Sequence, residues 1–447
     1  MKTFRLGGVH PNDNKLSAAV PFKKVPVPAE VTIPLDQHIG APATACVAVG
    51  DKVKVGQMIG QPGGFVSAAV HSSVSGTVKK IEKVRDAWGT YHNCIIIKTE
   101  GDEWLEDIDT TDALITECKL EPKQIIDKIT ASGIVGLGGA CFPTQVKLMP
   151  PKDCKIDTLI VNAVECEPYL THNHRLMLEK ADEVFIGVQI LLKALGIRKA
   201  IIGVENNKKD AIEHLKSLLP KYSKDYDITV APLKLKYPQG GEKQLIQALT
   251  GRIVRSGALP ASTGAVVQNV ATVFAVYEAV QKNKPIVEMA MTVSGKNVKE
   301  PGNFIVRIGT PLTDVVNMAG GIPEGTGKLI CGGPMMGRTM INTDTPANKR
   351  TSGVVMLPDD EAKRGVERNC IRCGKCIDAC PMGLEPYLLA TMSAKNMNDE
   401  LEQHYIYDCI ECGCCTFTCP SNRPLLDYIR QGKATVMGIM RSRTPKK

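Results

Sequence analysis

Two short stretches near the C-terminus establish the chemistry of that part of the chain. One reads CIRCGKCIDACP at residues 370–381, and the other reads CIECGCCTFTCP at residues 409–420. Both follow the pattern C-x2-C-x2-C-x3-C-P, which is typical of cysteines that hold [4Fe–4S] clusters. Residues 370–419 contain nine of the 16 cysteines of the chain. The two stretches therefore predict two [4Fe–4S] clusters in one domain.

The spacing also predicts which cysteines share a cluster. In such runs the first three cysteines ligate one cluster, and the fourth, next to a Pro, ligates the other. The predicted ligands are Cys370, Cys373, Cys376 and Cys419 for cluster 1, and Cys409, Cys412, Cys415 and Cys380 for cluster 2. Zinc sites, the alternative, usually take paired C-x2-C units. Because residues 386–396 have a helical pattern, we expect residues 360–435 to form a mainly helical, ferredoxin-like module.

Length and composition indicate a multidomain globular protein. The 447 residues are 43% hydrophobic, which is enough for roughly two to four domains. Aromatic residues make up 4%, and the net charge of +8 is spread over 55 basic and 47 acidic residues. Both features argue against a nucleic-acid-binding protein. Without an export signal, a disulfide framework is not expected.

No membrane-spanning segment is expected, since none reaches about 18 uninterrupted apolar residues. The nearest approach, residues 264–277, is interrupted by polar residues and fits a buried helix. Positive charge is concentrated only near the end of the chain, where we expect residues 436–447 to form a disordered basic tail.

Strand and helix patterns alternate within residues 106–280, which we expect to form one α/β domain. A buried strand at 159–164 precedes a helix at 181–195, which Gly196 closes. A strand at 199–204 and a helix at 208–219, stopped by Pro220, follow. This order predicts a parallel sheet covered by helices.

Three glycine-rich or polar stretches lie around these strands. GIVGLGGACFPTQVK at 133–147 would let backbone amides approach a phosphate, assisted by a helix beginning at Pro143 and by Lys147. NAVECEP at 162–168 ends a buried strand, where α/β sheets bind ligands. YPQGGEK at 237–243 begins another helix. Each stretch alone also fits an ordinary turn, so the residues by themselves leave phosphate binding open.

The flanking regions have simpler patterns. Short strands and turns within residues 1–105 resemble a biotinyl/lipoyl-type barrel-sandwich domain, but Ser72 and Ser73 occupy the position of the modified lysine, so we expect no covalent cofactor. After residue 281 we expect strands at 287–293 and 302–306 and a short helix at 311–321.

The order of the motifs resembles a known family. Together with VQNVAT at 267–272, the three stretches resemble the flavin- and NADH-binding subunit of respiratory complex I. With the N-terminal domain and the two-cluster module, the whole chain resembles the RnfC family, the C subunits of Rnf complexes, which are ion-translocating ferredoxin:NAD oxidoreductases. This resemblance implies a β-grasp-like domain of the soluble ligand-binding type at residues 281–350.

The resemblance also implies a non-covalent FMN site and an NADH site. The implied cofactor-binding residues are Gly136, Gly138, Gly139, Lys147, Asn162, Glu165, Glu167, Tyr237, Gly240, Gly241 and Asn269. The first three glycines and Lys147 would hold the FMN phosphate and frame the nicotinamide site. No side chain is expected to be catalytic, because hydride transfer would take place at the flavin.

The other implied roles concern the flavin ring and the nucleotide. Asn162 would bond the flavin, the 237–241 stretch would form the isoalloxazine wall, and Asn269 would face the ribityl or phosphate end. Glu165 and Glu167 would line the nucleotide pocket and repel a 2′-phosphate, which favours NADH over NADPH. The complex I pattern has acidic residues where this chain has Val164 and Gly241, so we expect the NADH contacts to differ from that pattern.

Two functions are compatible with these features. In the first, the chain is an oxidoreductase subunit that passes electrons between NADH, FMN and two [4Fe–4S] clusters. In the alternative, the α/β domain has lost its flavin, and the chain is an iron–sulfur electron-transfer adaptor that only docks redox partners. The resemblance favours the first, with the other Rnf subunits as partners, both the membrane subunits and the ferredoxin-like cluster subunit. It implies a peripheral position on the cytoplasmic face of the bacterial plasma membrane.

Overall fold

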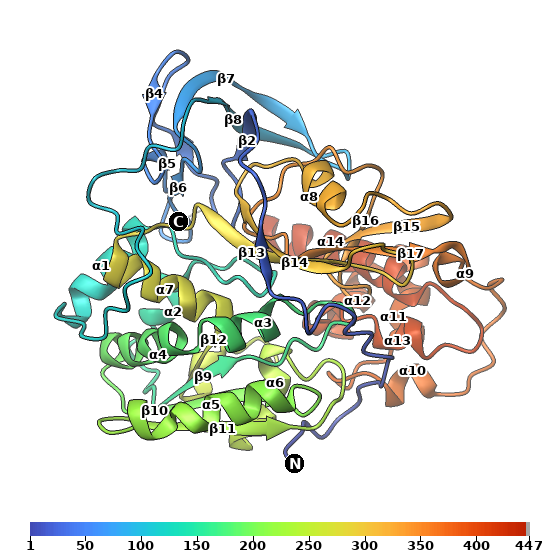
Figure 1. Ribbon diagram of the computed structural model, residues 1–447. Helices are drawn as coiled ribbons and strands as arrows, with labels where there is room; N and C mark the ends of the chain where they lie inside the picture. The colour runs from blue at the N-terminus through green and yellow to red at the C-terminus, as the bar shows by residue number, and fades with distance from the viewer. Residues whose placement is uncertain (444–447) are drawn as a thin grey trace.

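The computed structural model describes residues 1–443 and arranges its strands in four sheets (Figure 1). An α/β lobe lies at the lower left of Figure 1, and the cysteine-rich helices lie at the right. A six-stranded sheet occupies the middle, and a small barrel of strands lies at the top. The α/β lobe and the cysteine-rich helices are neighbours in space, since Gln244 donates to the Pro381 carbonyl at 3.3 Å.

The α/β lobe contains a sheet of four parallel strands in the order β11-β10-β9-β12. The chain extends from β9 through β10 to β11, and then returns to place β12 on the other side of β9. Such a reversal leaves a crevice at the carboxyl ends of the two flanking strands, here β9 and β12. The strands are β9 (Thr158–Asn162), β10 (Lys199–Glu205), β11 (Asp227–Leu233) and β12 (Ala265–Asn269). The helices are α1 (Pro122–Ala131), α2 (Thr144–Leu148), α3 (His172–Glu179), α4 (Ala181–Leu195), α5 (Lys209–Tyr222), α6 (Glu242–Thr250) and α7 (Val270–Lys282).

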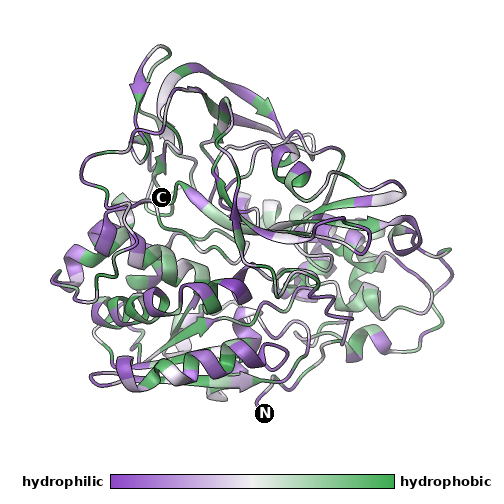
Figure 2. Cartoon of the chain, viewed as in Figure 1, coloured by the Kyte–Doolittle hydropathy of each residue, from purple (hydrophilic) through white to green (hydrophobic). Residues whose placement is uncertain are grey.

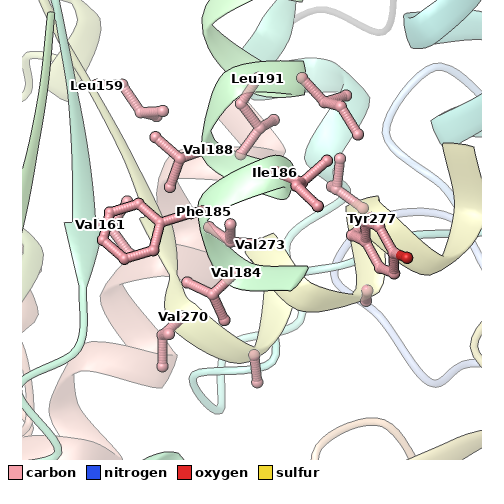
Figure 3. Packing of buried hydrophobic residues seen from close by; sticks show 14 of the residues in the cluster. Leu159, Val161, Val184, Phe185, Ile186, Val188, Leu191, Val270, Val273 and Tyr277 are labelled. Atoms are coloured by element: carbon pink, nitrogen blue, oxygen red, sulfur yellow. The ribbon is translucent and has the colours of Figure 1, made fainter. Parts of the chain in front are cut away.

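Helices α4 and α7 pack together over one face of this sheet. Val184, Val188 and Leu191 of α4 repeat at helical spacing and lie beside Leu159 and Val161 of β9 (Figure 3). In Figure 2 the inner strands are mostly green, whereas the outer helices α1 and α5 carry more purple. The predicted helix at 181–195 is confirmed, and Gly196 closes it with a positive φ of 65°.

Two sequence predictions for this lobe are wrong. Residues 264–277 do not form one helix: residues 265–269 pair with β9 as the fourth strand, and Asn269 then caps α7 through the Ala271 amide. Pro220 does not stop α5, which continues to Tyr222. The extra turn is favoured because the Tyr222 ring stacks on Phe185, with centroids 5.0 Å apart.

The six-stranded sheet has the order β1-β14-β13-β17-β15-β16. The predicted strands at 287–293 and 302–306 and the short helix at 311–321 are confirmed within one to three residues. The sheet is composed of β1 (Phe22–Lys24), β13 (Glu288–Ser294), β14 (Gly302–Arg307), β15 (Thr326–Cys331), β16 (Arg338–Met340) and β17 (Gly353–Pro358), with α8 (Leu312–Met318) beside it.

The barrel consists of a four-stranded sheet, β2-β8-β7-β4, and a three-stranded sheet, β3-β5-β6. Its strands are β2 (Glu30–Pro34), β3 (Thr44–Ala45), β4 (Lys52–Val53), β5 (Met58–Gln61), β6 (Val70–His71), β7 (Gly76–Arg85) and β8 (Tyr91–Thr99). Ser72 and Ser73 are fully buried, and Ser73 Oγ donates to the Ile308 carbonyl at 2.5 Å. The position of a modified lysine in related barrels is here a contact between two domains.

Residues 2–24 form an extended segment, the N-terminal strap, that lies outside the barrel. In Figure 1 it runs as a blue ribbon from the bottom of the molecule toward the top. Lys2 bridges to Leu233 at the end of β11, and Val9 bridges to Tyr237. The Gly8 amide donates to the Ala379 carbonyl of the cysteine-rich module, and β1 then joins β14. The strap therefore connects three of the domains.

From residue 359 to 443 the elements are helical, in agreement with the predicted mainly helical module. They are α9 (Asp359–Ala362), α10 (Lys375–Asp378), α11 (Pro386–Ala394), α12 (Asn398–Gln403), α13 (Cys414–Phe417) and α14 (Leu425–Arg443). No helix within residues 1–443 combines the length and the apolar character needed to cross a bilayer.

The expected disordered tail at residues 436–447 is a wrong prediction for residues 436–443, which continue α14; residues 444–447 lie outside the described part. The helix persists because Val436 is buried in the core of the module. The charge of Arg443 is also paired, since this residue contacts Glu402 at 2.7 Å and Asp399 at 3.5 Å on α12.

Candidate functional site

The carboxyl ends of β9 and β12 bring two predicted flavin-site residues together. Asn162 and Asn269 are direct neighbours in the parallel register of the two strands. The Asn162 amide donates to the Gly240 carbonyl at 2.8 Å, which fastens the 237–243 stretch to the end of β9. Motifs separated by about a hundred residues of sequence thus meet at the crevice where α/β sheets bind ligands.

The glycine-rich loop lies over the same crevice. The Leu137 amide donates to Thr272 Oγ at 2.8 Å, and a side chain at Gly138 would contact Asn269 at 3.4 Å. The amides of residues 138–140 have no hydrogen-bond partner within the described chain, and the three residues are exposed. Gly139 has a φ of 107° and open space where a Cβ would be. Successive free backbone amides in a loop are the kind of donors that bind phosphate in proteins.

Lys147 reaches the same place but is already paired. Its Nζ lies 2.6 Å from Glu242 Oε1 and 3.0 Å from the Val267 carbonyl. The helix that was expected to begin at Pro143 is α2, which has only five residues, so its dipole adds little to the site. A phosphate would therefore depend on the free amides and on exchange of Lys147 away from Glu242.

Glu165, predicted to line the nucleotide pocket, is buried and caps a helix in this structure. Its carboxylate accepts from the amides of Asn173 at 2.7 Å and His174 at 3.2 Å at the start of α3. Burial alone would raise the pKa of Glu165, but the charges of His172 and Lys15 hold it below its usual value. The Glu165 carboxylate therefore stabilises the fold around the crevice through the start of α3.

Glu167, also predicted to line the pocket, connects the α/β lobe to the six-stranded sheet. Its carboxylate accepts from the amides of Met335 at 3.0 Å and Met336 at 2.8 Å, and from the Tyr237 hydroxyl at 3.3 Å. A side chain at Gly333 would lie 2.2 Å from Glu167 Oε2, so only glycine permits this approach. Burial raises the pKa of Glu167 to about 7.

Sequence reasoning missed the cations that hold this loop. Lys15 Nζ, on the N-terminal strap, donates to the carbonyls of Glu165, Glu167 and Leu170 at 2.7–2.8 Å. Lys208 is also buried and donates to the Val164 carbonyl at 2.8 Å. No local pattern identifies Lys15, because its partners lie about 150 residues along the chain.

The predicted ligands of cluster 2 line one pocket. Cys409, Cys412 and Cys415 come from the second run, and Cys380 reaches the pocket from the first, as the spacing predicts. Within residues 1–443, no three His, Cys, Asp or Glu side chains form a group that could hold a metal ion. The four cysteines thus line one pocket together, as the ligands of one shared cluster would.

The predicted ligands of cluster 1 lie nearer the surface. Cys370 and Cys373 are exposed, whereas Cys376 and Cys419 are half-buried. Cys376 and Cys419 pack against the same buried cluster, and the Arg368 amide donates to the Ser421 carbonyl at 2.9 Å, so the end of the second run returns to the first. Each fourth cysteine thus lies near the other run, which is the arrangement that the predicted exchange of ligands requires.

Both runs have the same backbone conformation. Arg372 and Gly374 in the first run have φ of 53° and 76°, and Glu411 and Gly413 in the second have 57° and 79°. Each run then enters a four-residue helix, α10 or α13. Local sequence is sufficient to set this turn, since the two runs have different surroundings.

The cluster-2 pocket and the flavin-site motifs touch directly. Tyr237 packs in one buried apolar cluster with Cys412 and Cys414, and Cys166 packs against the same group. Gln244 of α6 donates to the Pro381 carbonyl at 3.3 Å, beside Cys380. No such contact joins the cluster-1 cysteines to the α/β lobe among the described residues.

Comparisons with known families divide the chain into four matched parts. Residues 2–102 match the RnfC barrel sandwich hybrid domain, residues 129–278 the Nuo51 FMN-binding domain, residues 291–339 the SLBB domain, and residues 362–420 the 4Fe-4S dicluster domain. The chain thus has an FMN-binding domain and a dicluster domain, in agreement with the predicted FMN and [4Fe–4S] cofactors. These matches favour the oxidoreductase over the flavin-free adaptor.

Relatives are similar over most of the chain. The C subunit of the proton-translocating ferredoxin:NAD(+) oxidoreductase complex of Clostridium ljungdahlii is 45% identical, over 91% of this chain and 87% of its own length. The C subunit of the Na(+)-translocating ferredoxin:NAD(+) oxidoreductase complex of Acetobacterium woodii is 44% identical over 97% of both chains. The C subunit of the ion-translocating oxidoreductase complex of Salmonella dublin is 41% identical over 97% of this chain, which spans 61% of that longer protein.

Among solved structures, the NAD+-reducing [NiFe]-hydrogenase in the air-oxidized state has a similar fold. The TM-score is 0.50 at 19% identity, and the match covers 73% of this chain and 68% of the other. The sequence identity to the relatives is stronger evidence for the family than this similarity of fold. On their identity and coverage, the chain belongs to the family of C subunits of the ion-translocating ferredoxin:NAD(+) oxidoreductase complexes.

Proposed function

We propose that this chain is the peripheral subunit through which its complex exchanges electrons with NADH, using FMN at the β9–β12 crevice and two [4Fe–4S] clusters. The observation that carries the proposal is the packing of Tyr237 and Cys166, from the flavin-site motifs, in one buried apolar group with Cys412 of the second cysteine run. This contact joins the two cofactor regions without an intervening layer. When bound, FMN supplies the conversion between two-electron and one-electron transfer, and the clusters supply one-electron storage.

The α/β lobe contributes binding and orientation. The free amides of residues 138–140 would hold the FMN phosphate, and Lys147 would add charge after leaving Glu242. Asn162 and Gly240, fixed by their 2.8 Å hydrogen bond, would present a rigid wall to the flavin ring. Rigid positioning of this kind is what a protein adds to cofactor chemistry.

Glu165 and Glu167 stabilise the loop that carries part of the site. Glu165 anchors the 162–168 loop to α3, and Glu167 anchors it to Tyr237 and the Met335–Met336 amides. We assign both residues the role of holding the crevice in shape, and we assign the NADH contacts to the open side of the glycine-rich loop.

We infer an order of electron transfer from the positions of the cysteines. Cluster 2, held by Cys380, Cys409, Cys412 and Cys415, would be next to the flavin, because its pocket adjoins Tyr237. Cluster 1 would lie at the outer end, because Cys370 and Cys373 are exposed. The same path serves either direction of net flow.

The wider assignment follows the family. The relatives are named as subunits of ferredoxin:NAD(+) oxidoreductase complexes that translocate protons or Na+. We therefore assign the other subunits of such a complex as partners of this chain, and a peripheral position on the cytoplasmic face of the membrane.

An anaerobic NADH titration of the iron-reconstituted chain with FMN tests the proposal. Absorbance near 450 nm (about the usual flavin maximum) and the cluster EPR signal are followed together. We expect bleaching of a bound flavin followed by the signal of a reduced cluster. Two clusters that dithionite reduces, with no bound flavin and no response to NADH, would support the adaptor instead.

A matched pair of variants locates the phosphate. Lys147→Met should weaken FMN binding about 10- to 100-fold, the range for loss of a charge-assisted hydrogen bond of about 1.5–3 kcal/mol. Glu242→Gln removes the competing carboxylate and should leave FMN binding equal or tighter. Equal weakening by both variants would place the phosphate elsewhere.

A further inference from the structure

The loop before cluster 1 is unusually open. All residues from Lys363 to Cys373 are exposed, and in Figure 1 the loop between α9 and α10 forms the right-hand edge of the molecule. Two of the predicted cluster-1 ligands, Cys370 and Cys373, lie in this exposed stretch. We call residues 363–376 the cluster-1 face.

The cluster-1 face is strongly basic. It contains five cations, Lys363, Arg364, Arg368, Arg372 and Lys375, and a single carboxylate, Glu367. Arg364 pairs with Asp427, and Glu367 pairs with Arg423 at 3.7 Å. The other four cations form no ion pair with any residue from 1 to 443, so most of the charge of this face is available to a partner.

The second cysteine run, which has the same backbone, shows a different arrangement of charge. Its nearby cations, Arg430 and Lys433, both contact Glu411, at 3.2 and 3.1 Å. An unpaired excess of cations is therefore not a general property of these cluster loops. It is confined to the half of the module that reaches the surface.

The backbone of the cluster-1 face is held in place. The Arg368 amide donates to the Ser421 carbonyl at 2.9 Å, and Ser421 Oγ donates to the Asn369 carbonyl at 3.0 Å. Asn422 Nδ2 donates to the Val366 carbonyl at 3.2 Å. The cations thus project from a preformed surface, which lowers the ordering cost of binding.

Two apolar side chains lie among the cations. Val366 is 79% exposed and Ile371 is 67% exposed. Exposed apolar side chains beside polar and charged ones are common in protein–protein interfaces.

We propose that the cluster-1 face docks an acidic, iron–sulfur-carrying domain of another subunit of the complex. The inference rests on the proposed function, because it needs cluster 1 to carry electrons. One electron crosses at each step: the donor cluster is oxidised by one electron and the acceptor cluster is reduced by one, with no bond made or broken. Two such steps balance the two electrons of one NADH.

The charge identifies the partner as acidic, and the apolar side chains indicate a subunit that stays bound. Unpaired cations steer a negatively charged domain toward the exposed cysteines. A carrier that only visits the site would gain from the charge alone, whereas Val366 and Ile371 offer apolar area to a lasting interface.

The test is assembly of the whole complex with a charge-reversed face. The triple variant Lys363→Glu, Arg368→Glu, Lys375→Glu changes three unpaired cations and no cysteine. We expect recovery of the other subunits with this chain to fall by about tenfold or more at low salt. In the wild type we expect recovery to fall as salt rises, because screening weakens the charge contribution.

A matched control reverses three exposed cations of the α/β lobe that have no ion pair among the described residues: Lys209→Glu, Lys216→Glu, Lys224→Glu. Its recovery should equal that of the wild type. If the control loses as much as the triple variant, or if the triple variant keeps the wild-type recovery and salt dependence, the proposal is wrong. It is also wrong if assembly is intact and only binding of a soluble acidic two-cluster ferredoxin is lost.

Separate assays, independent of complex assembly, test the proposed function. The purified chains are assayed for iron content, dithionite-reduced EPR and NADH bleaching of FMN, all of which should be unchanged in the triple variant. A wild type that fails the NADH assay contradicts the proposed function, whatever the assembly result. If the triple variant loses cluster 1, the uncharged pair Val366→Ser, Ile371→Ser replaces it, and unchanged recovery with that pair overturns the proposal.

Discussion

The two cysteine runs have the same sequence pattern and the same backbone turns, yet their surroundings are opposite. Cys412 and Cys415 of the second run are buried, and the run packs against Tyr237 and the strap. Cys370 and Cys373 of the first run are exposed. The cations near the second run are paired with Glu411, whereas most of those near the first are unpaired.

This difference shows how one repeated motif can form both ends of an electron-transfer path. The turn and the cysteine spacing are local, so both halves can hold a cluster. The second run is buried against the flavin domain, so it lies inside the protein. The first run is exposed, so it lies at the surface end of the path. The following predictions test this division.

The largest effect is expected from removal of one ligand in each half. With Cys412→Ser, NADH should still bleach the flavin but should no longer reduce a cluster, because the cluster next to the flavin is lost. With Cys373→Ser, NADH should still reduce cluster 2. EPR of NADH-reduced and dithionite-reduced samples, with iron content, measures both.

Cys414→Ala is the control for this pair, since Cys414 is buried beside the pocket but is not a predicted ligand. It should retain both clusters. Reduction of a cluster by NADH in Cys412→Ser would contradict the proposed order.

A smaller effect is expected at the contact between the strap and cluster 2. Gly7 has a φ of 65°, and a Cβ there would lie 2.4 Å from the Cys380 carbonyl carbon. Gly7→Ala should weaken this contact by about 3 kcal/mol, since a left-handed backbone costs about 1–2 kcal/mol and overpacking about 1–3 kcal/mol. Hydrogen exchange of the Gly8 and Val9 amides should then be about 100-fold faster.

Gly50→Ala provides the comparison, because Gly50 has a φ of 96° but open space around it. The Gly50 variant has the energetic cost of a left-handed backbone but no steric clash. It should leave the hydrogen-exchange rates of the strap amides unchanged. Equal exchange rates in the Gly7 variant and the wild type would show that the strap does not need this close approach.

The smallest effect is expected from the charge that separates the two halves. Glu411→Gln frees Arg430 and Lys433, which are about one quarter to one third exposed in their side chains. Stability should fall by about 1 kcal/mol or less, as for a partly exposed ion pair. The midpoint potential of cluster 2 should rise, because unpaired cations favour the more negative reduced form.

An EPR-monitored redox titration measures this shift. Glu367→Gln at the more exposed cluster-1 face is the matched variant, and its shift should be smaller because solvent screens the charge. A larger shift at cluster 1 would reverse the comparison.

Much of the α/β lobe could be predicted from local patterns. The helix at 181–195 and its Gly196 cap follow from helical spacing and from the need for a positive φ, and both are found. The fourth strand, residues 265–269, could not be identified in this way. Its apolar residues suit a helix or a strand equally, and only pairing with β9 decides between them.

The proximity of the motif residues was predictable, but not all of their contacts were. The three motifs and Asn269 meet at one crevice, because polar residues at the ends of parallel strands collect there. Glu165 and Glu167 are instead occupied by backbone amides of α3 and of the 332–337 loop. A carboxylate in a motif does not reveal whether it faces a ligand or a neighbouring amide.

The sequence by itself determined the chemistry of this protein: the cysteine spacing specifies two clusters, and the ordered motifs specify a flavin domain. These are local properties, since ligand spacing and tight turns depend on residues a few positions apart. Only the tertiary structure decided that the second cysteine run adjoins Tyr237, that Lys15 of the strap holds the 162–168 loop, and that the first run faces solvent with unpaired cations. Those features depend on burial and charge pairing between segments far apart in the chain.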